Sequence, residues 1–286
     1  MDKLWAKLKK VPRAIASDRQ LTFGCIGLAL LLLIILFSGA LMTFDAYDYT
    51  ADSLAAPGEN GHLLGTNKLG QDVYSMLIAG VSTSLRVALI SSFISGLIGV
   101  LLGGVAGYLG GKTDAVISEI INVFMMIPTF FLILMIVALF GNSITNVMIV
   151  IGLTSWASNA KLMRAQALSL RERTFVKSAI VMGETRRQIL FKYIIPNGIF
   201  PVVANTTMGM SGAILTEASL SFLGLGDVNI ISWGQMIYDG KSYITSAWWI
   251  AAFAGLAIVV TVIIFYMLGD GLNHVLNPKR RKGGAN

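Results

Sequence analysis

The sequence has few charged residues, one cysteine and two histidines, and each scarcity excludes a class of protein. Only 13% of its 286 residues are charged, against roughly 25% in an average soluble domain, so most of the chain is predicted to lie in a bilayer. The lone Cys25 excludes an internal disulfide and a thiolate metal cluster. With only His62 and His274, the sequence shows no metal-ligand spacing and no nucleophile–base motif, so we expect no metal site and no enzyme active site.

A complete phosphate-binding loop is also lacking. Residues 110–113 read Gly-Gly-Lys-Thr, which matches the end of such a loop. The motif requires a further glycine five positions before its last one, and Ala106 stands there. An apolar run precedes these residues where the motif requires a strand. We therefore expect a short turn followed by a helix start at Thr113-Asp114, and no ATP hydrolysis by this chain.

The basic residues gather in a few places. Of the 22 Lys and Arg residues, nineteen lie in 1–20, at Lys112, in 161–192 and in 279–282. Membrane proteins carry such an excess of positive charge on their cytoplasmic side, and the pattern argues against nucleic acid as a partner. Acidic residues outnumber basic ones in 44–79 and in 224–246, so we predict that these segments lie outside the cell.

Long apolar runs predict an all-α, polytopic membrane protein with six transmembrane helices. About 20 helical residues cross the roughly 30 Å of hydrocarbon in a bilayer. The first run, 21–43, is longer than the apolar region of about 7–15 residues in a signal peptide, so it is predicted to be retained. The expected order is a cytoplasmic basic tail (1–20), the first span (21–43), an extracytoplasmic segment (44–79), a core of five spans (80–273) and a second cytoplasmic basic tail (274–286).

Within the core we expect the second span at 87–111 and the fifth at 193–216. Two spans are predicted within 120–160, separated at Gly141-Asn142-Ser143, and the sixth within 242–269. Pro128 is expected to kink the third span. Glycines recur four residues apart at 99, 103, 107 and 111, which indicates close packing against another helix; a sliding interface is the alternative.

The main polar stretch on the predicted cytoplasmic side of the spans is 164–197. Between positions 161 and 192 the chain has eight basic and two acidic residues. Two short amphipathic helices joined at Gly183 are predicted, and Phe175, Ala179 and Met182 would share one face of the first. Because an apolar face outside the lipid needs a cover, we interpret this stretch as a docking surface for another protein; packing on the chain's own span ends is the alternative.

Glu217 lies at the end of the fifth predicted span. A carboxylate at that depth is costly unless it is paired or near water. Two roles are open: a polar contact at the translocation pathway or its outer gate, or a structural hydrogen bond that ties the span to the turn at 222–226. We favour the structural role.

A motif that reads Glu-Ala-Ala, three variable residues and Gly, then a stretch ending in Leu-Pro, stands here as Lys177-Ser178-Ala179, Gly183 and Ile195-Pro196-Asn197. Together with three further motifs it resembles, over nearly the whole chain, the permease subunits of ATP-driven dipeptide, oligopeptide and nickel importers. The other three are residues 64–72 (LGTNKLGQD), 217–226 (EASLSFLGLG) and 269–272 (GDGL), the last followed by Asn277-Pro278. This chain departs from the family pattern at Lys177 and Ser178, where Glu and Ala are usual, and at Asn67 and Gln71, where Asp and Arg are usual.

The resemblance implies the type I importer permease fold and a non-catalytic subunit in the plasma membrane of a bacterium or archaeon, with both termini cytoplasmic. It also implies a homologous second permease, two cytoplasmic ATPase subunits that carry ATP and Mg, and an extracytoplasmic substrate-binding protein, besides the membrane lipid. This chain itself would bind no cofactor. The residues expected to couple it to the ATPases are Phe175, Val176, Lys177, Ser178, Ala179, Met182, Gly183, Arg186 and Pro196.

We therefore predict a subunit that forms half of a translocation pathway for peptides. A permease for nickel or another metal chelate is the alternative within the family. A self-sufficient secondary transporter or channel is the alternative from another class, which would usually show inverted repeats or broken helices with buried charges. The substrate itself does not follow from the sequence.

Overall fold

The computed structural model describes residues 18–276, so the greater part of both predicted basic tails lies outside the described residues. Helices make up most of the described chain. Among the described residues, β-type backbone pairing is limited to an isolated antiparallel bridge between Thr66 and Asp72. The α-helices are α3 (Arg19–Leu36), α4 (Ser38–Leu41), α5 (Val73–Leu109), α6 (Gly111–Met126), α7 (Thr129–Phe140), α8 (Ile144–Thr154), α9 (Trp156–Arg171), α10 (Thr174–Val181), α11 (Arg186–Ile189), α12 (Ile195–Leu220), α13 (Trp233–Gly240) and α14 (Trp248–Leu276).

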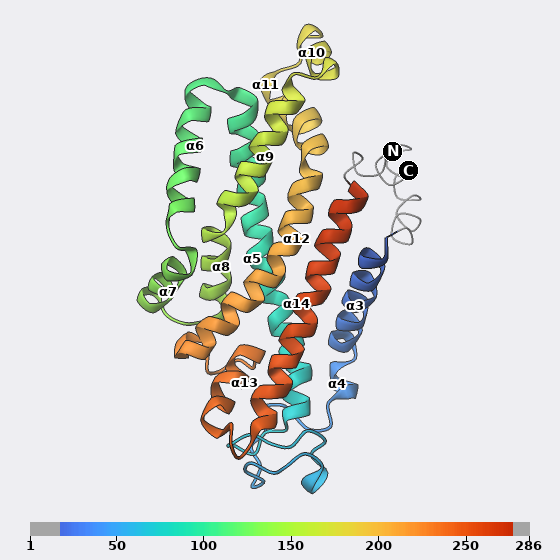
Figure 1. The fold of residues 1–286 in the computed structure, drawn as a ribbon, viewed down its shortest axis with the longest axis vertical. Coiled ribbons are helices and arrows are strands. Elements are labelled where there is room, and N and C mark those ends of the chain that lie inside the picture. Colours follow the sequence, from blue (N-terminus) through green and yellow to red (C-terminus); the bar gives the residue numbers. More distant parts are fainter. Residues whose placement is uncertain (1–17, 277–286) are drawn as a thin grey trace, which may run out of the picture.

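The long helices run side by side as an elongated bundle (Figure 1). Helix α5 packs against α9 and α12, and α14 packs against α12 and α3. Helices α10 and α11 lie at one end of the bundle, whereas α13 and the segment between α4 and α5 lie at the other. The prediction of an all-α polytopic membrane protein is confirmed by these apolar helices.

The predicted spans differ from the observed helices in the middle of the chain. Four described helical stretches are each long and apolar enough to cross a membrane: 19–36, 73–109, 186–225 and 248–275. Helices α6 and α7, with 16 and 12 residues, make a fifth candidate only as a pair, and the pair is bent by 84°. Pro128 precedes α7 and marks this break, so the expected kink is present but is a sharp bend. The predicted fourth span is likewise two helices, α8 and α9, which join at Ser155.

Helix α5 begins fourteen residues before the predicted second span. Asp72 caps its first turn, because its side chain accepts a hydrogen bond from the backbone N–H of Ser75 at 2.8 Å. The second oxygen of the same carboxylate lies 2.9 Å from Nδ1 of the buried His62. Residues 73–86, which the sequence divides between the outer segment and the start of the core, thus belong to one helix with the predicted second span, and this helix is longer than a bilayer requires.

The glycines of α5 confirm the packing interpretation of their spacing. A Cβ atom added at Gly103 would overlap the carbonyl oxygen of Ala160, and one added at Gly107 would overlap that of Arg164. Only glycine therefore allows α5 and α9 to approach this closely. The last glycine of the series, Gly111, has open space around it and begins α6 instead, two residues before the predicted start at Thr113-Asp114.

The segment 45–72 is held to the bundle by hydrogen bonds. Trp249 Nε1 donates to the carbonyl oxygen of Thr66 at 3.1 Å. Asn67 Nδ2 donates to Gln71 Oε1 at 2.8 Å, and both side chains are buried. An amide pair therefore stands at the two positions where the resembling family usually has Asp and Arg.

Candidate functional site

Of the two short helices predicted on either side of Gly183, the first is present as α10. The second, α11, is not a separate short helix but the first turn of the continuous helical stretch 186–225. Gly183 has φ +81°, a left-handed conformation that favours glycine. Thr185 caps α11 through its hydrogen bond with the backbone of Gln188, whose side chain in turn accepts from the backbone N–H of Thr185 at 2.8 Å. The α10–α11 unit is thus a defined turn and not an irregular loop.

The predicted polar stretch 164–197 is less separate from the spans than expected. Helix α9 continues through Arg171, and Arg164 holds Asp114 of α6 through two hydrogen bonds, from Nε at 2.5 Å and from Nη2 at 2.7 Å. A bidentate pair of this kind fixes both orientation and distance. Arg164 therefore ties α9 to α6, and the unit that projects from the bundle begins only after Arg171.

The predicted apolar face on α10 is divided between two directions. Ala179 and Val176 are fully buried, in a cluster with Met163, Ile189 and Ile194. The expectation that Ala179 belongs to an exposed docking face is therefore wrong: it packs on the chain's own helices, as does Val176. The other seven predicted coupling residues are all exposed, namely Phe175, Lys177, Ser178, Met182, Gly183, Arg186 and Pro196.

An exposed apolar surface nevertheless remains at the end of α10. Val181 is 88% exposed and Met182 is 72% exposed; Ile180, next to them, and Phe175, in the first turn of the helix, are also exposed. We call Phe175, Ile180, Val181 and Met182 the α10 tip. Burial of such side chains is worth roughly 1.5–3 kcal/mol each, so a partner that covers the α10 tip would gain binding free energy.

Lys177 is paired with a carboxylate of its own chain. Its Nζ lies 3.3 Å from Glu172 Oε2, and Arg171 Nε lies 3.4 Å from the other oxygen. The hydrogen bond and charge of Lys177 hold the pKa of the Glu172 carboxyl below its usual value. The position where the resembling family usually has glutamate is therefore occupied here by the positive member of an intrachain ion pair.

Glu217 is buried at the far end of α12, where it joins two elements. Its Oε1 accepts hydrogen bonds from the hydroxyls of Ser221 and Ser232, both at 2.8 Å. Ser232 also caps α13 by accepting from Gln235 N at 3.1 Å. These contacts agree with the structural role that we favoured, although the partner beyond Ser221 is the start of α13 and not the turn at 222–226.

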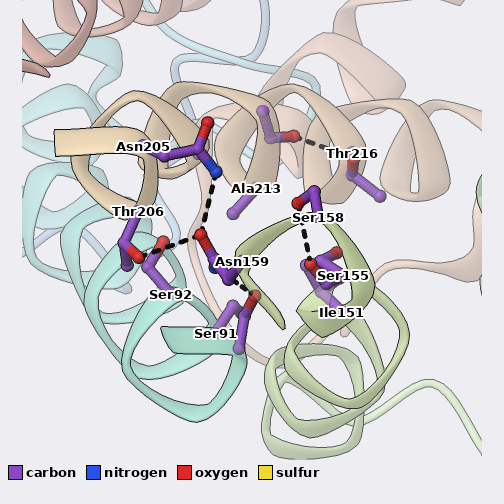
Figure 2. Close-up of a pocket in the computed structure, with 13 residues that line it drawn as sticks. Ser91, Ser92, Ile151, Ser155, Ser158, Asn159, Asn205, Thr206, Ala213 and Thr216 are labelled. Atoms are coloured by element: carbon purple, nitrogen blue, oxygen red, sulfur yellow. Dashed lines mark hydrogen bonds between the residues drawn. The ribbon is translucent and has the colours of Figure 1, made fainter. Parts of the chain in front are cut away.

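A polar cavity between α5, α8, α9 and α12 was not anticipated from the sequence. Its volume is about 240 Å³ and none of its lining side chains is charged. Figure 2 shows Asn205 and Thr206 directed toward Asn159, whereas the hydroxyls of Thr216 and Ser158 donate to backbone oxygens nearby in the chain. The lining residues are Ser91, Ser92, Ser95, Ile151, Ser155, Ser158, Asn159, Asn205, Thr206, Gly209, Gly212, Ala213 and Thr216.

Asn159 is the centre of this cavity wall. Its Nδ2 donates to Ser95 Oγ at 3.0 Å, and its Oδ1 accepts from Asn205 Nδ2 at 2.8 Å and from Thr206 Oγ1 at 3.3 Å (Figure 2). One side chain on α9 therefore links α5 and α12. The available signal in the sequence was the presence of Ser, Thr and Asn in the middle of apolar runs, where polar groups usually face a protein interior or water.

Comparison with known proteins identifies the family. Residues 99–282 match the family described as binding-protein-dependent transport system inner membrane component. The oligopeptide transport system permease protein OppC of Haemophilus influenzae is 37% identical over 84% of this chain and 77% of its own. The dipeptide permease DppC of Alkalihalophilus pseudofirmus is 34% identical over 94% of this chain and 89% of its own. The chain belongs to this family.

Other relatives extend the comparison. The glutathione transport system permease protein GsiD of Pectobacterium atrosepticum is 36% identical over 91% of this chain and 88% of its own. Among solved structures, an inward-facing MetNI methionine ABC transporter matches 71% of this chain and 96% of its own, with TM-score 0.55 at 21% identity. That likeness confirms the type I importer permease fold. The family match includes the α10–α11 unit, α12 and Glu217. Because the members of this family are inner-membrane components of transport systems, this chain is a non-catalytic, multi-pass permease subunit of the inner membrane.

Proposed function

We propose that this chain forms half of a translocation pathway for peptides and that the α10 tip couples it to two ATPase subunits on the cytoplasmic side. The remaining partners are a homologous second permease and an extracytoplasmic binding protein, and ATP and Mg are held by the ATPases. The α10 tip supports the coupling role most directly, because it is apolar, exposed and at one end of the bundle (Figure 1), within the stretch 161–192 that has eight basic residues.

Peptides are the substrate class that the relatives favour. The permeases named above are called oligopeptide, dipeptide and glutathione permeases, and glutathione is itself a small peptide. These names argue against the nickel alternative. Family membership argues against the self-sufficient transporter or channel, since this family works with a binding protein.

The proposal includes six spans, with α6–α7 and α8–α9 each counted as one, and both termini in the cytoplasm. Cysteines introduced at Asn60 and Arg173 in a Cys25→Ser background test the orientation. An impermeant thiol reagent should label position 60 from the outside and position 173 from the cytoplasmic side. Labelling of both positions from one side would refute the arrangement.

Crosslinking tests the coupling role itself. In the assembled importer, Val181→Cys in the Cys25→Ser background should crosslink to an ATPase subunit through a short bifunctional reagent. Thr207→Cys, in the middle of α12, is the control and should not. If position 181 crosslinked only within this chain or to the second permease, the α10 tip would not be the coupling surface.

A further inference from the structure

The polar cavity around Asn159 lies halfway along the two longest helices of the bundle. Ser91 stands eighteen residues from each end of α5. Asn205 stands nineteen and twenty residues from the ends of the helical stretch 186–225. Both helices are apolar enough to cross a membrane, so the cavity lies at mid-height of the bundle, within its membrane-spanning part, where polar groups require a protein or water environment.

The cavity opens at the surface of this chain. Ser158, Gly209 and Gly212 line it and are exposed. Lipid tails offer no hydrogen bonds to such a surface. Its open side therefore fits a water-filled pathway better than a lipid contact.

Its glycines are not explained by helix packing. A Cβ atom added at Gly209 or Gly212 would have no atom within 4 Å, whereas one added at Gly103 on α5 would overlap α9. Glycine in the middle of a helix lowers the free energy of unfolding by about 0.5–1 kcal/mol relative to alanine. At Gly103 the missing side chain permits close packing against α9. At Gly209 and Gly212 the missing side chain leaves open space beside the cavity instead.

Hydrogen-bonding groups remain available in the wall. Among the residues that the structure describes, the Ser92 hydroxyl has no partner although only 5% of the residue is exposed. Asn205 uses its Nδ2 for Asn159, and its Oδ1 accepts no hydrogen bond within the described chain. The wall can thus both donate and accept hydrogen bonds, and it carries no charge.

We infer that this cavity holds a short stretch of the main chain of the transported peptide during its passage, an inference that rests on the proposed function. Peptide N–H and C=O groups are neutral donors and acceptors, which matches the wall. The volume of about 240 Å³ is below the roughly 300–1,000 Å³ that encloses a drug-sized ligand. The cavity therefore fits a segment of a peptide and not a whole peptide, and it contacts the main chain, which is common to all peptides.

Filling the cavity tests the inference. In proteoliposomes that contain the complete importer, Gly212→Leu should lower uptake of a labelled peptide roughly tenfold or more, while assembly and binding-protein-stimulated ATP hydrolysis remain within about twofold. Gly255→Leu is the matched control, because Gly255 on α14 also has open space beside it but adjoins an apolar cavity; it should leave uptake unchanged.

Charge placed in the cavity gives a second readout, which a purely structural role would not produce. Ser158→Asp should lower uptake of an anionic peptide roughly tenfold more than that of a cationic peptide of equal length, and Ser158→Lys should do the reverse. A peptide with a photoreactive residue should crosslink to residues of the cavity wall in the assembled importer, independently of turnover.

The outcomes separate this inference from the proposed function. If the wild-type importer takes up no peptide, the proposed function fails and the inference falls with it. If the wild type transports peptides but Gly212→Leu does so equally well, or if both Ser158 variants affect all peptides alike, the cavity inference alone is wrong. Loss of the second permease from the Gly212→Leu complex would show that the cavity is a subunit contact, and this result also overturns the inference.

Discussion

Asn205 of α12 donates a hydrogen bond to Oδ1 of Asn159 on α9 at 2.8 Å, and Asn159 in turn donates to Ser95 of α5. Three helices are thereby joined by a single buried amide in the middle of the bundle. Hydrogen bonds between membrane helices contribute modestly on average, but an amide with three partners leaves several polar groups unpaired when it is removed.

Asn159→Leu is therefore expected to destabilise the protein. Loss of each buried hydrogen bond leaves a partner unsatisfied at about 1–3 kcal/mol, so the midpoint of thermal unfolding of the purified complex should fall by several degrees. Ser158→Ala is the control, because the Ser158 hydroxyl makes only a 3.5 Å contact with the Ser155 carbonyl. An equal midpoint for Asn159→Leu and wild type would show that this amide does not hold the helices together.

Two glycine-to-alanine changes should have opposite effects. Gly103→Ala places a Cβ against the Ala160 backbone and should separate α5 from α9, with a clear loss of thermal stability. Gly209→Ala meets open space and should be neutral or stabilising by about 0.5–1 kcal/mol. Unfolding midpoints of the two purified variants check this, and similar shifts in the same direction would contradict the packing account.

Glu217→Gln should be milder than Glu217→Leu. The amide oxygen of glutamine can still accept from Ser221 and Ser232, whereas leucine leaves both hydroxyls unpaired inside the protein, at about 1–3 kcal/mol each. Transport and membrane protein level should be measured together for both variants. A glutamine variant that is as inactive as the leucine variant, at a normal protein level, would mean that the negative charge itself acts in the pathway.

Substitutions in the α10 tip test the coupling role more directly than substitutions on the buried side of the same helix. Met182→Asp places a charge on a side chain that is 72% exposed, so it should reduce peptide-stimulated ATP hydrolysis and transport without changing the amount of folded protein. Ala179→Asp would place a charge at a fully buried position and should lower the amount of folded protein as well. If an importer with Met182→Asp hydrolysed ATP and transported peptide at the wild-type rates, the α10 tip would not be a functional contact.

The sequence predicts those parts of the structure that depend on local patterns. The α10–Gly183–α11 turn follows from the apolar spacing around a glycine, and the break at Pro128 follows from the missing N–H of proline. The 84° angle between α6 and α7 does not follow, because it depends on what each helix packs against. The early start of α5 was missed because residues 73–86 contain Ser, Thr and Arg, which weaken an apolar run without preventing a helix.

The candidate site was predicted only in part for a similar reason. Spacing places Phe175, Ala179 and Met182 on one helix face, but whether that face meets solvent or Met163 and Ile194 is decided by distant segments. The cavity around Asn159 combines side chains from four helices, which no local pattern can bring together. The need of Glu217 for a nearby partner follows from its place at the end of an apolar span, but the identity of Ser232 as that partner does not, because the fold brings it there from fifteen residues away.

The most direct test of the central claim is ATP-dependent accumulation of a labelled oligopeptide by proteoliposomes that hold this chain, the second permease, the ATPase subunits and the binding protein. We expect accumulation only with all subunits and ATP present, and its loss with Met182→Asp in the assembled complex. No peptide accumulation by the complete wild-type importer, or accumulation by this chain without the ATPases, would contradict the account.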